Sequence, residues 1–343
     1  MGLGTATTAF SVLGIVVASV AIWIGSGYFE AAATRLAAVY GLPAVVQGSV
    51  VVAVGSSLPE LASVVFAGLA GSFDLGVGAI VGSAIFNVLV IPAVAGLSTG
   101  TPLEASRAIV YKEAQFYMIS VSALVVTFAL AVIYLPLPDG PALVGQLNRP
   151  LAAIPLGLYG LYLFIQWQDV SDFEPPAPPD GIDRRREWVK FVAGLFVILV
   201  AVHLLVGEVE ALSVTFGVPS FLAGVTIVAA ATSLPDLLVS VRSAGDARSE
   251  TSLGNVLGSN TFDLLVAIPV GVFIVGTVPV DFAVAAPMFG VLTLATVLLF
   301  ALLRTKLTLS AVESYTLLVA YAIFVAWVAA ESLGLLGLLK TAG

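Results

Sequence analysis

The sequence predicts an all-α polytopic membrane protein of ten transmembrane helices, arranged as two inverted five-helix repeats with broken helices 2 and 7. Three observations lead to this fold class. Of the 343 residues, 59% are hydrophobic and only 10% are charged, which lies far outside the range of soluble globular chains. Several apolar runs are ~20 residues long, enough for a helix to cross ~30 Å of hydrocarbon. One polar motif inside such a run occurs twice, 176 positions apart.

The composition also excludes several alternatives. A transmembrane β-barrel would alternate apolar and polar residues along each strand, whereas these runs are apolar throughout. The chain contains no cysteine, so disulfides and thiolate metal sites are impossible, and we expect any metal ligands to be oxygen atoms. The first apolar run has no Lys or Arg before it and is too long for a signal-peptide core, so we expect it to remain as a spanning helix.

The first half of the chain contains five predicted spans. The second is long enough to cross the bilayer with a break at its midpoint, and the third is rich in glycine, which lets another backbone approach closely. The turn Pro136–Gly140 separates the fourth span from the fifth. The spans are expected at about Thr5–Gly27, Leu42–Ala70, Leu75–Leu97, Glu113–Leu135 and Leu151–Trp167.

A polar, proline-rich segment joins the two halves. It contains Pro175-Pro176-Ala177-Pro178-Pro179 and Arg184-Arg185-Arg186 and is typical of a linker. We therefore expect a first five-helix repeat in residues 1–167, a linker in 168–187 and a second five-helix repeat in 188–343. The later spans are expected at about Trp188–Val206, Pro219–Val241, Ser252–Gly276, Phe282–Leu303 and Ala311–Leu333.

An internal duplication relates the two halves. The stretch GSSLPE, which ends at Glu60, corresponds to ATSLPD, which ends at Asp236. One ungapped shift of 176 positions aligns residues 48–92 with residues 224–268, and 14 of the 45 aligned positions are identical. The same shift places Asn87 on Asp263, so two polar positions in each half differ only conservatively.

The two repeats are expected to have opposite orientations in the membrane. Five is an odd number, so a second set of five spans starts from the opposite side. The positive-inside rule tests this, because cytoplasmic loops hold the excess of Lys and Arg. With the linker in the cytoplasm, eleven Lys and Arg residues lie inside and only Arg149 and Lys340 lie outside. Both termini are then extracellular.

The repeated motif has the chemistry of a cation site. A proline inside a helix removes one hydrogen bond and displaces the carbonyl four residues earlier, so Pro59 and Pro235 should each free a backbone oxygen. Each motif also offers one carboxylate and two hydroxyl groups. These groups are Glu60 with Ser56 and Ser57, and Asp236 with Thr232 and Ser233. Sets that contain only oxygen suit hard cations such as Ca²⁺ and Na⁺.

A buried carboxylate in a span can also be purely structural, paired with a neighbouring group. The repetition argues against this reading, because an intramembrane acid costs ~2.5–3.5 kcal/mol on insertion scales and here it occurs twice. Asn87 and Asp263 on the following spans extend the symmetric set to four polar groups. Inverted repeats whose broken helices meet near the midplane are the architecture of secondary transporters.

Four segments resemble one transporter family. GSSLPELASVV with GVGAIVGSAIFN, and ATSLPDLLVSV with GNVLGSNTFDLLV, are similar to the two alpha-repeats of the cation/calcium antiporter superfamily, specifically the sodium/calcium exchangers. The resemblance covers both repeats and nearly the whole ten-span frame. It implies an exchanger that opens alternately to each side and moves Ca²⁺ against Na⁺ across the plasma membrane through one central site.

The resemblance also implies a set of ion ligands. Glu60 and Asp236 would be the calcium carboxylates. The remaining sodium and calcium ligands would be Ser56, Ser57, Thr232, Ser233, Ser83, Ser259, Asn87 and Asp263, together with main-chain oxygens near Ala53 and Ala229. It implies no enzymatic activity, no cofactor besides the transported ions, no nucleic-acid partner and a functional monomer in the lipid bilayer.

Two details indicate a branch of the superfamily. Prokaryotic sodium/calcium exchangers usually carry Glu where this chain has Asp236, and Gly-Asn where it has Gly78-Ala79. Asp in the second repeat, together with GVGAIVGSAIFN in the first, makes the chain more similar to the potassium-dependent branch. The cation/proton branch places Glu on the third and eighth spans, where this chain has Asn87 and Asp263. A Ca²⁺/H⁺ antiporter is therefore the alternative.

Two further classes fit the residues less well. Asp236 and Asp263 on adjacent spans could form the acid pair of an intramembrane aspartyl protease. The second aspartate lacks the Gly-x-Gly-Asp context of that family, and Glu60 and Asn87 would have no role. A passive channel needs a continuous polar pore, whereas these polar groups cluster at one depth of the predicted spans.

Overall fold

The computed structural model describes residues 2–41, 53–100, 102–138, 140–168, 181–245 and 249–339. Within these residues, eight helices are long and apolar enough to cross a membrane. A bent pair, Ser220–Thr232 with Leu234–Arg242, makes a ninth span, and the shorter helix Leu58–Leu69 belongs to the second predicted span, whose start at 42–52 lies outside the described residues. The ten positions expected from the sequence are therefore all accounted for.

In the first half, each of the five predicted spans contains helix. The third is interrupted at Val90, where Pro92 enters the first turn of the next helix, and the fourth begins with a π-helical turn, η2. The elements are α1 (Gly2–Val39), α3 (Ala53–Ser56), α4 (Leu58–Leu69), α5 (Phe73–Leu89), α6 (Ile91–Ser98), η2 (Ala108–Glu113), α7 (Ala114–Tyr134) and α8 (Arg149–Gln168).

The second half repeats this order. Its second and third spans both contain a π-helical turn, η3 and η4. The elements are α9 (Arg184–Phe216), α10 (Ser220–Ala223), η3 (Gly224–Val228), α11 (Ala229–Thr232), α12 (Leu234–Gly245), α13 (Ser249–Phe262), η4 (Asp263–Ala267), α14 (Ile268–Val275), α15 (Phe282–Lys306) and α16 (Ala311–Ser332).

The first span of each half is longer than its apolar run predicts. Helix α1 continues twelve residues beyond Gly27 to Val39, because the intervening residues are good helix formers and the first breaking signal is Gly41, which has a φ of 67°. Helix α9 begins at Arg184, so Arg184–Glu187 belong to a helix and not to the expected linker. The Asp183 carboxylate caps this helix by accepting hydrogen bonds from the Arg185 and Arg186 amides. The linker residues 169–180 lie outside the described residues.

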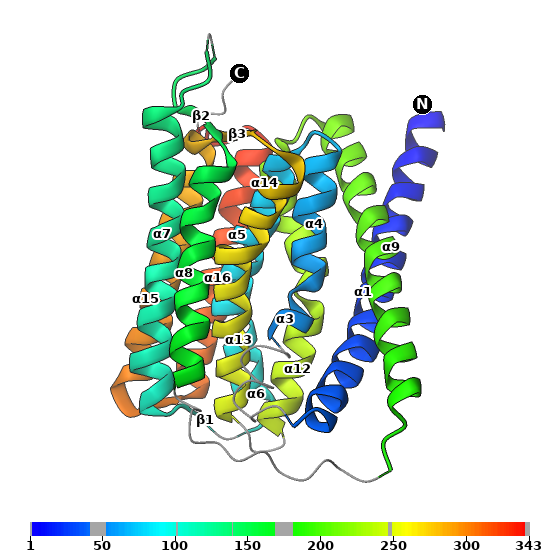
Figure 1. Cartoon of the computed structure of the whole chain (residues 1–343). Coiled ribbons are helices and arrows are strands. Elements are labelled where there is room, and N and C mark those ends of the chain that lie inside the picture. The colour runs from blue at the N-terminus through cyan, green and yellow to red at the C-terminus, as the bar shows by residue number, and fades with distance from the viewer. Residues whose placement is uncertain are drawn as a thin grey trace.

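Four short strands join the halves in a way that the sequence did not predict. Strand β1 (Leu103–Glu104), between the third and fourth spans, pairs with β4 (Thr308–Leu309), between the ninth and tenth. Strand β2 (Val144–Leu147), between the fourth and fifth spans, pairs with β3 (Val278–Asp281), between the eighth and ninth. Each pair is antiparallel, and the repeat relation converts one pair into the other. The two pairs lie at opposite ends of the bundle (Figure 1), as an inverted repeat requires.

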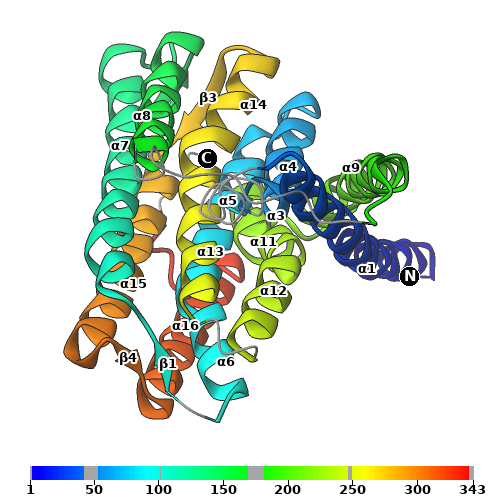
Figure 2. The ribbon, with the colours of Figure 1, turned by 60° about the horizontal axis from the view of Figure 1, so that its bottom comes forward.

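Burial distinguishes a central core from the flanking helices. The most apolar stretch of span Phe73–Ser98 is 94% buried and that of Ser252–Val275 is 78% buried, whereas those of α1 and α16 are only 22% buried. Helices α1 and α9 lie against each other at one flank, and α7, α8 and α15 form the opposite flank (Figures 1 and 2). The third and eighth spans are therefore the centre around which the other helices pack.

Glycines on α5 allow the repeats to approach backbone to backbone. A Cβ atom at Gly78 would lie 2.2 Å from the Phe221 carbonyl oxygen, and one at Gly82 would lie 2.2 Å from the Val225 carbonyl oxygen. Conversely, a Cβ at Gly224 would lie 2.1 Å from the oxygen of Leu75. No side chain fits at these positions, so the predicted packing role of the α5 glycines is seen directly.

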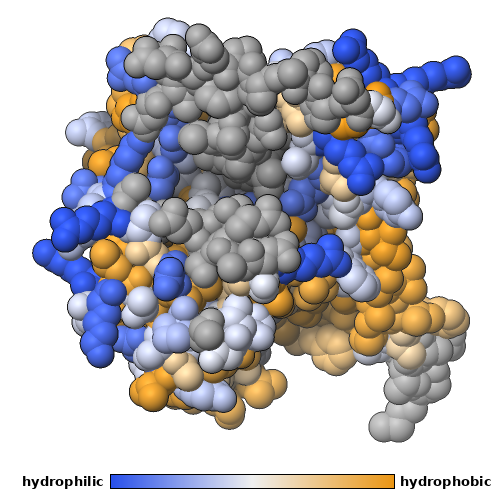
Figure 3. All heavy atoms as spheres, turned by 90° about the horizontal axis from the view of Figure 1, so that it is seen from below, coloured by the Kyte–Doolittle hydropathy of each residue, from blue (hydrophilic) through white to orange (hydrophobic). Residues whose placement is uncertain are grey.

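The basic residues gather at one end of the bundle. Arg35 at the end of α1 forms an ion pair with Glu187 at the start of α9, with 3.2 Å between Nη1 and Oε1. Helix α15 carries Arg304 and Lys306 in its last turn at the same end. Viewed from this end, hydrophilic residues lie along the left and the upper right of the molecule, whereas hydrophobic residues cover its lower right side (Figure 3).

Candidate functional site

The second span of each half is broken at the predicted place. Helix α3 ends at Ser56 and α4 begins at Leu58, whereas α11 ends at Thr232 and α12 begins at Leu234. The residues between them, Ser57 (φ −87°, ψ 4°) and Ser233 (φ −80°, ψ −4°), have nearly the same conformation. The second half bends by 41° at its break. Equivalent sequences in the two repeats thus produce equivalent interruptions.

The breaks place two carboxylates at helix N-termini. Glu60 lies in the first turn of α4 and Asp236 in the first turn of α12, each directly after a proline. The new helices begin with hydrogen bonds from Leu61 N to Ser57 O (3.0 Å) and from Leu237 N to Ser233 O (3.1 Å). A helix N-terminus carries a partial positive charge, which stabilises an ionised carboxylate in the first turn.

All the polar side chains predicted for the site are completely buried. Each is 0% exposed, although long-chain acids and amides normally lie at the surface of a protein. A buried polar group without a partner costs free energy, so a cluster of this size needs either internal hydrogen bonds or a bound ligand. The buried set consists of Ser56, Ser57, Glu60, Ser83, Asn87, Thr232, Ser233, Asp236, Ser259 and Asp263.

One group of contacts surrounds Glu60. The Ser83 hydroxyl on α5 donates to Glu60 Oε1 at 3.3 Å, and the Ser233 hydroxyl at the second break donates to Ser83 Oγ at 2.8 Å. Thr232 also faces the Glu60 carboxylate. The first repeat's acid is therefore held by hydroxyl groups from both repeats.

A second group of contacts surrounds Asp236. The Asn87 amide on α5 donates to Asp236 Oδ2 at 3.1 Å, and Ser56 and Ser259 face the same carboxylate. At the first break, the Ser57 hydroxyl donates to the Ser259 carbonyl oxygen at 3.4 Å. The predicted residues of the two repeats thus converge on one region between α4, α5, α12 and α13.

Five buried oxygen atoms of the predicted ligands have no hydrogen-bond partner among the described residues. They are Glu60 Oε2, Asn87 Oδ1, Asp236 Oδ1 and both carboxylate oxygens of Asp263. Among the described residues, no three acid or histidine side chains alone form a metal cluster. A cation here would therefore need a mixed set of carboxylate, amide, hydroxyl and carbonyl oxygens, which is the ligand chemistry of Ca²⁺ and Na⁺.

Several predicted ligands are partly engaged by their own helix. The Thr232 hydroxyl donates to Val228 O at 3.1 Å, and the Ser259 hydroxyl donates to Val256 O at 3.2 Å. Each hydroxyl oxygen keeps lone pairs for another partner. The Ala229 carbonyl accepts from Ser233 N at 3.0 Å. Ala53 is the first residue of α3, and its side chain lies outside the described part of the chain.

One further residue, Asn260, belongs to the site and was not revealed by the sequence. The Asn260 side chain on α13 accepts a hydrogen bond from Asn87 Nδ2 at 2.9 Å, and its own amide donates to Ala84 O and to the Tyr117 hydroxyl, each at 3.2 Å. Asn260 therefore connects the Asn87–Asp236 pair to helix α7. The counterpart of Asn260 by the 176-residue shift is Ala84. A search for polar residues at matched positions of the two repeats therefore does not find Asn260.

Comparison with known proteins supports the fold and assigns the family. The family described as sodium/calcium exchanger protein matches residues 10–168 and 187–330. Over 328 residues, the chain is 29% identical to "Putative antiporter CaxA" of Alkalimonas amylolytica, covering 92% of this chain and 96% of that protein. It is also 27% identical to the inner membrane protein YrbG of Escherichia coli, covering 69% and 71%.

A more local similarity and a solved structure complete the comparison. Over 81 residues, 24% of this chain and 13% of the relative, the chain is 42% identical to human sodium/potassium/calcium exchanger 3. The solved structure of the sodium-calcium exchanger NCX_Mj superimposes with a TM-score of 0.62 at 21% identity, covering 93% of this chain and 98% of that one. The fold matches over nearly its full length, and this chain belongs to the sodium/calcium exchanger family, a family of membrane transporters and not of enzymes.

Proposed function

We propose that this protein is a secondary active antiporter that exchanges Ca²⁺ for Na⁺ across the cell membrane through the site between its two broken helices. The observation that carries the proposal is the set of five unpartnered, fully buried oxygens on Glu60, Asn87, Asp236 and Asp263. An unpaired buried polar atom is costly, and a transported cation would supply the missing partner for several of them at once.

The charges of the site favour a divalent ion with additional monovalent ions. Glu60, Asp236 and Asp263 can carry up to three negative charges, and no basic side chain hydrogen-bonds any of them in the described residues. Burying uncompensated charge is strongly unfavourable. One Ca²⁺ with one monovalent cation would neutralise the three acids, and so would three Na⁺. The same groups could thus hold either cargo in turn, which is the requirement for exchange.

We assign the ligands by their positions in the repeats. Glu60 and Asp236 are the proposed calcium carboxylates, because each lies at a break and at a helix N-terminus. Asn87 and Asp263 would complete the site from α5 and η4. The hydroxyls of Ser56, Ser57, Ser83, Thr232, Ser233 and Ser259, with the carbonyls of Ala53 and Ala229, are the proposed further oxygen ligands for Ca²⁺ or Na⁺.

Potassium participation is a refinement of this proposal. Asp236 and Asp263 differ from their counterparts Glu60 and Asn87, and the local similarity to sodium/potassium/calcium exchanger 3 reaches 42% over 81 residues. Both observations favour the potassium-dependent branch. A Ca²⁺/H⁺ antiporter is the second candidate, since a proton on Asp263 would also remove the third charge of the site.

We place the basic end of the bundle, which includes Arg35, Lys190 and Arg304, in the cytoplasm, with the linker on the same side and both termini outside. The positive-inside rule supports this orientation. Residues 1–167 and 188–343 would then be the two repeats, and their first spans, α1 and α9, would move during transport against a core built from both repeats. We expect a single chain to suffice, because the ligands come from both halves of one molecule.

The decisive experiment is transport by the purified protein in liposomes. Uptake of ⁴⁵Ca²⁺ is measured while Na⁺, K⁺ and H⁺ gradients are imposed separately. Ca²⁺ uptake that requires an outward Na⁺ gradient supports sodium exchange, and a further requirement for K⁺ supports the potassium-dependent branch. Uptake driven equally well by a proton gradient without Na⁺ would contradict the proposal and support the second candidate.

A further inference from the structure

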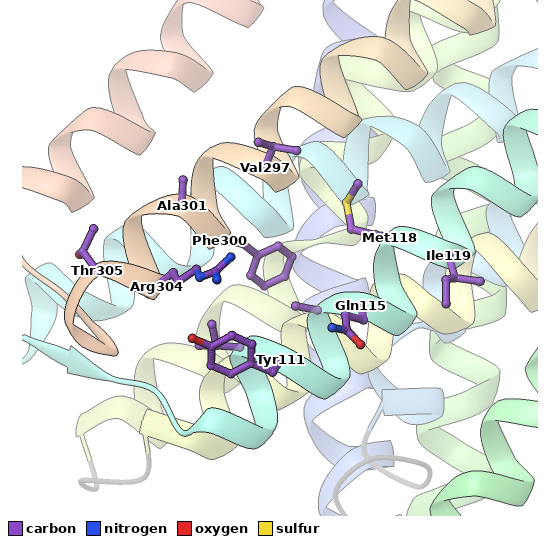
Figure 4. A pocket seen from close by; sticks show the side chains of 11 residues that line it. Tyr111, Gln115, Met118, Ile119, Val297, Phe300, Ala301, Arg304 and Thr305 are labelled. Atoms are coloured by element: carbon purple, nitrogen blue, oxygen red, sulfur yellow. The ribbon is translucent and has the colours of Figure 1, made fainter.

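A groove on the outer surface of the bundle has the shape and polarity of a lipid site. It lies between η2 and α7 on one side and α15 on the other, at the basic end, with a cavity volume of about 830 Å³ (Figure 4). Its residues come from Val110–Ile119 on one side and Val297–Thr305 on the other. The two sides therefore follow their helices for ten and nine residues, about 12–14 Å at 1.5 Å per residue. Tyr111 and Ile119 in its lining are exposed side chains, so the groove is open at the outer surface of the bundle.

The wall of the groove changes from polar to apolar along the helix axes. At the end of the bundle it is lined by Tyr111, Arg304 and Thr305, and deeper in the membrane by Met118, Ile119 and Val297. Exposed apolar side chains continue beyond it, with Ile133 on α7 66% exposed and Leu294 on α15 70% exposed. A molecule that fills this groove should have a polar end at the membrane surface and an apolar end in the hydrocarbon.

The polar end is cationic and available. The Arg304 Cζ atom lies 5.6 Å from the centroid of the Tyr111 ring, a cation–π contact that holds the guanidinium at the mouth of the groove. Within the described residues, no carboxylate forms an ion pair with Arg304. Glu313 contacts the neighbouring Thr305 at 3.4 Å, but it is held in the capping box of α16 by Ser310.

We propose that this groove binds an anionic phospholipid, with its phosphate on Arg304 and an acyl chain along Met118, Ile119 and Val297. Arginine binds phosphate through several N–H donors in a fixed planar geometry. Basic pockets between transmembrane helices are suited to lipid headgroups, and one basic residue placed against the phosphate accounts for about a fivefold preference for anionic lipid. The proposal does not depend on which ions are exchanged.

The test is competitive lipid retention by the purified full-length protein. The protein in detergent is mixed with equal amounts of phosphatidylglycerol and phosphatidylcholine, and native mass spectrometry counts the lipids that remain bound. We expect the wild type to retain phosphatidylglycerol about fivefold in preference. Arg304→Ala should remove this preference, whereas Lys306→Ala should keep it, because Lys306 has a similar charge at the same helix end but does not line the groove.

A second pair of variants tests the apolar part. Ala301→Trp adds bulk inside the groove and should reduce retention of both lipids, whereas Leu294→Trp adds the same bulk to the exposed surface of α15 outside it and should not. Size-exclusion chromatography and thermal unfolding check that each variant is folded. Equal retention of the two lipids by the wild type, or equal effects of Arg304→Ala and Lys306→Ala, would overturn the proposal. Retention by Ala301→Trp equal to that of Leu294→Trp would overturn the placement of the acyl chain.

Discussion

The Asn87 amide on α5 donates a hydrogen bond of 3.1 Å to the Asp236 carboxylate on α12, so a polar residue of one repeat directly orients the acid of the other. The equivalent pair under the repeat relation is Asp263 and Glu60. Those two side chains are both acids, and neither can donate a hydrogen bond to the other when both are ionised. The site is therefore geometrically symmetric and chemically asymmetric.

Removing either central acid should abolish calcium transport. We expect Glu60→Ala and Asp236→Ala to weaken Ca²⁺ binding by about 100-fold or more, because each removes a buried charge from its cation. The measurement is Na⁺-driven ⁴⁵Ca²⁺ uptake in liposomes, with the exposed acid Glu104 changed to Ala as the control. Uptake at the wild-type rate in folded Glu60→Ala protein would exclude Glu60 as an ion ligand.

Asp263 should decide which monovalent ions take part. Asp263→Asn gives η4 the amide that α5 already has at Asn87 and removes one of the three charges. Calcium binding through Glu60 and Asp236 should persist, while the charge moved per cycle changes or any potassium requirement disappears. Transport current and ⁴⁵Ca²⁺ flux are recorded together with and without K⁺ and at several pH values. A mutant that matches the wild type in coupling ratio, potassium response and pH response rules out this role.

Helices α1 and α9 should move together against the buried core. Phe29 on α1 contacts Phe191 on α9, with ring centroids 4.3 Å apart, and also lies beside Gly55, where a Cβ would be 3.3 Å from the Phe29 ring. The chain has no cysteine, so paired cysteines are clean probes. Crosslinking Phe29→Cys to Gly55→Cys should stop transport but not Ca²⁺ binding.

The matched control keeps one cysteine in place. Crosslinking Phe29→Cys to Phe191→Cys joins two helices that are expected to move as a unit, so turnover should continue. Equal inhibition by both crosslinks, or full turnover after the Phe29–Gly55 crosslink, contradicts a moving α1–α9 pair.

Asn260 should act by positioning Asn87. Asn260→Ala removes the acceptor for Asn87 Nδ2 and leaves buried polar atoms unsatisfied, which costs about 1–2 kcal/mol. We therefore expect calcium affinity to fall roughly five- to thirtyfold. Tyr117→Phe removes only the hydroxyl that contacts Asn260 and should have a smaller effect. Isothermal titration with Ca²⁺ measures both, and unchanged affinity in Asn260→Ala would show that Asn87 holds its position without it.

The backbones of α5 and η3 lie so close together at Gly82 that we expect no side chain to be tolerated at this position. Gly82→Ala would place a Cβ 2.2 Å from the Val225 carbonyl oxygen, and overpacking of this kind destabilises by about 1–3 kcal/mol. Gly160→Ala on exposed α8 meets nothing within 4 Å in the described residues and should not lower stability. Thermal unfolding in detergent compares the two. Equal melting temperatures would mean that the helices can separate at Gly82 without cost.

The sequence predicted the frame of the fold because each part of it left a periodic or repeated signal. Apolar run length located the spans, and the 176-residue shift located Glu60, Asp236, Asn87 and Asp263, which the structure brings into one buried region. Apolar run length predicted too short a helix for α1, because residues 28–39 are helix formers but do not form a continuous apolar run. Hydrophobicity marks the part of a helix inside the membrane and not the end of the helix.

Other features left no signal that local patterns could detect. Asn260 has an alanine as its counterpart, so its role follows only from its contacts with Asn87 and Tyr117. Strand β1 has two residues and β2 has four, too few for an alternating pattern. Their pairing depends on the bundle bringing distant loops together, which is a tertiary property.

The pairing of β1 with β4 and of β2 with β3 also determines the order in which the strands can pair during synthesis. Strand β2 finds its partner β3 only after about 130 further residues have been synthesised, and β1 waits about 200 residues for β4. At ~5–20 residues per second, these delays are on the order of 10 s or more. During this time the first five helices are already in the membrane with both loop edges unpaired. A ribosome that stalls between the halves would therefore leave an intermediate in which β1 and β2 keep unpaired strand edges, which are templates for pairing with another chain.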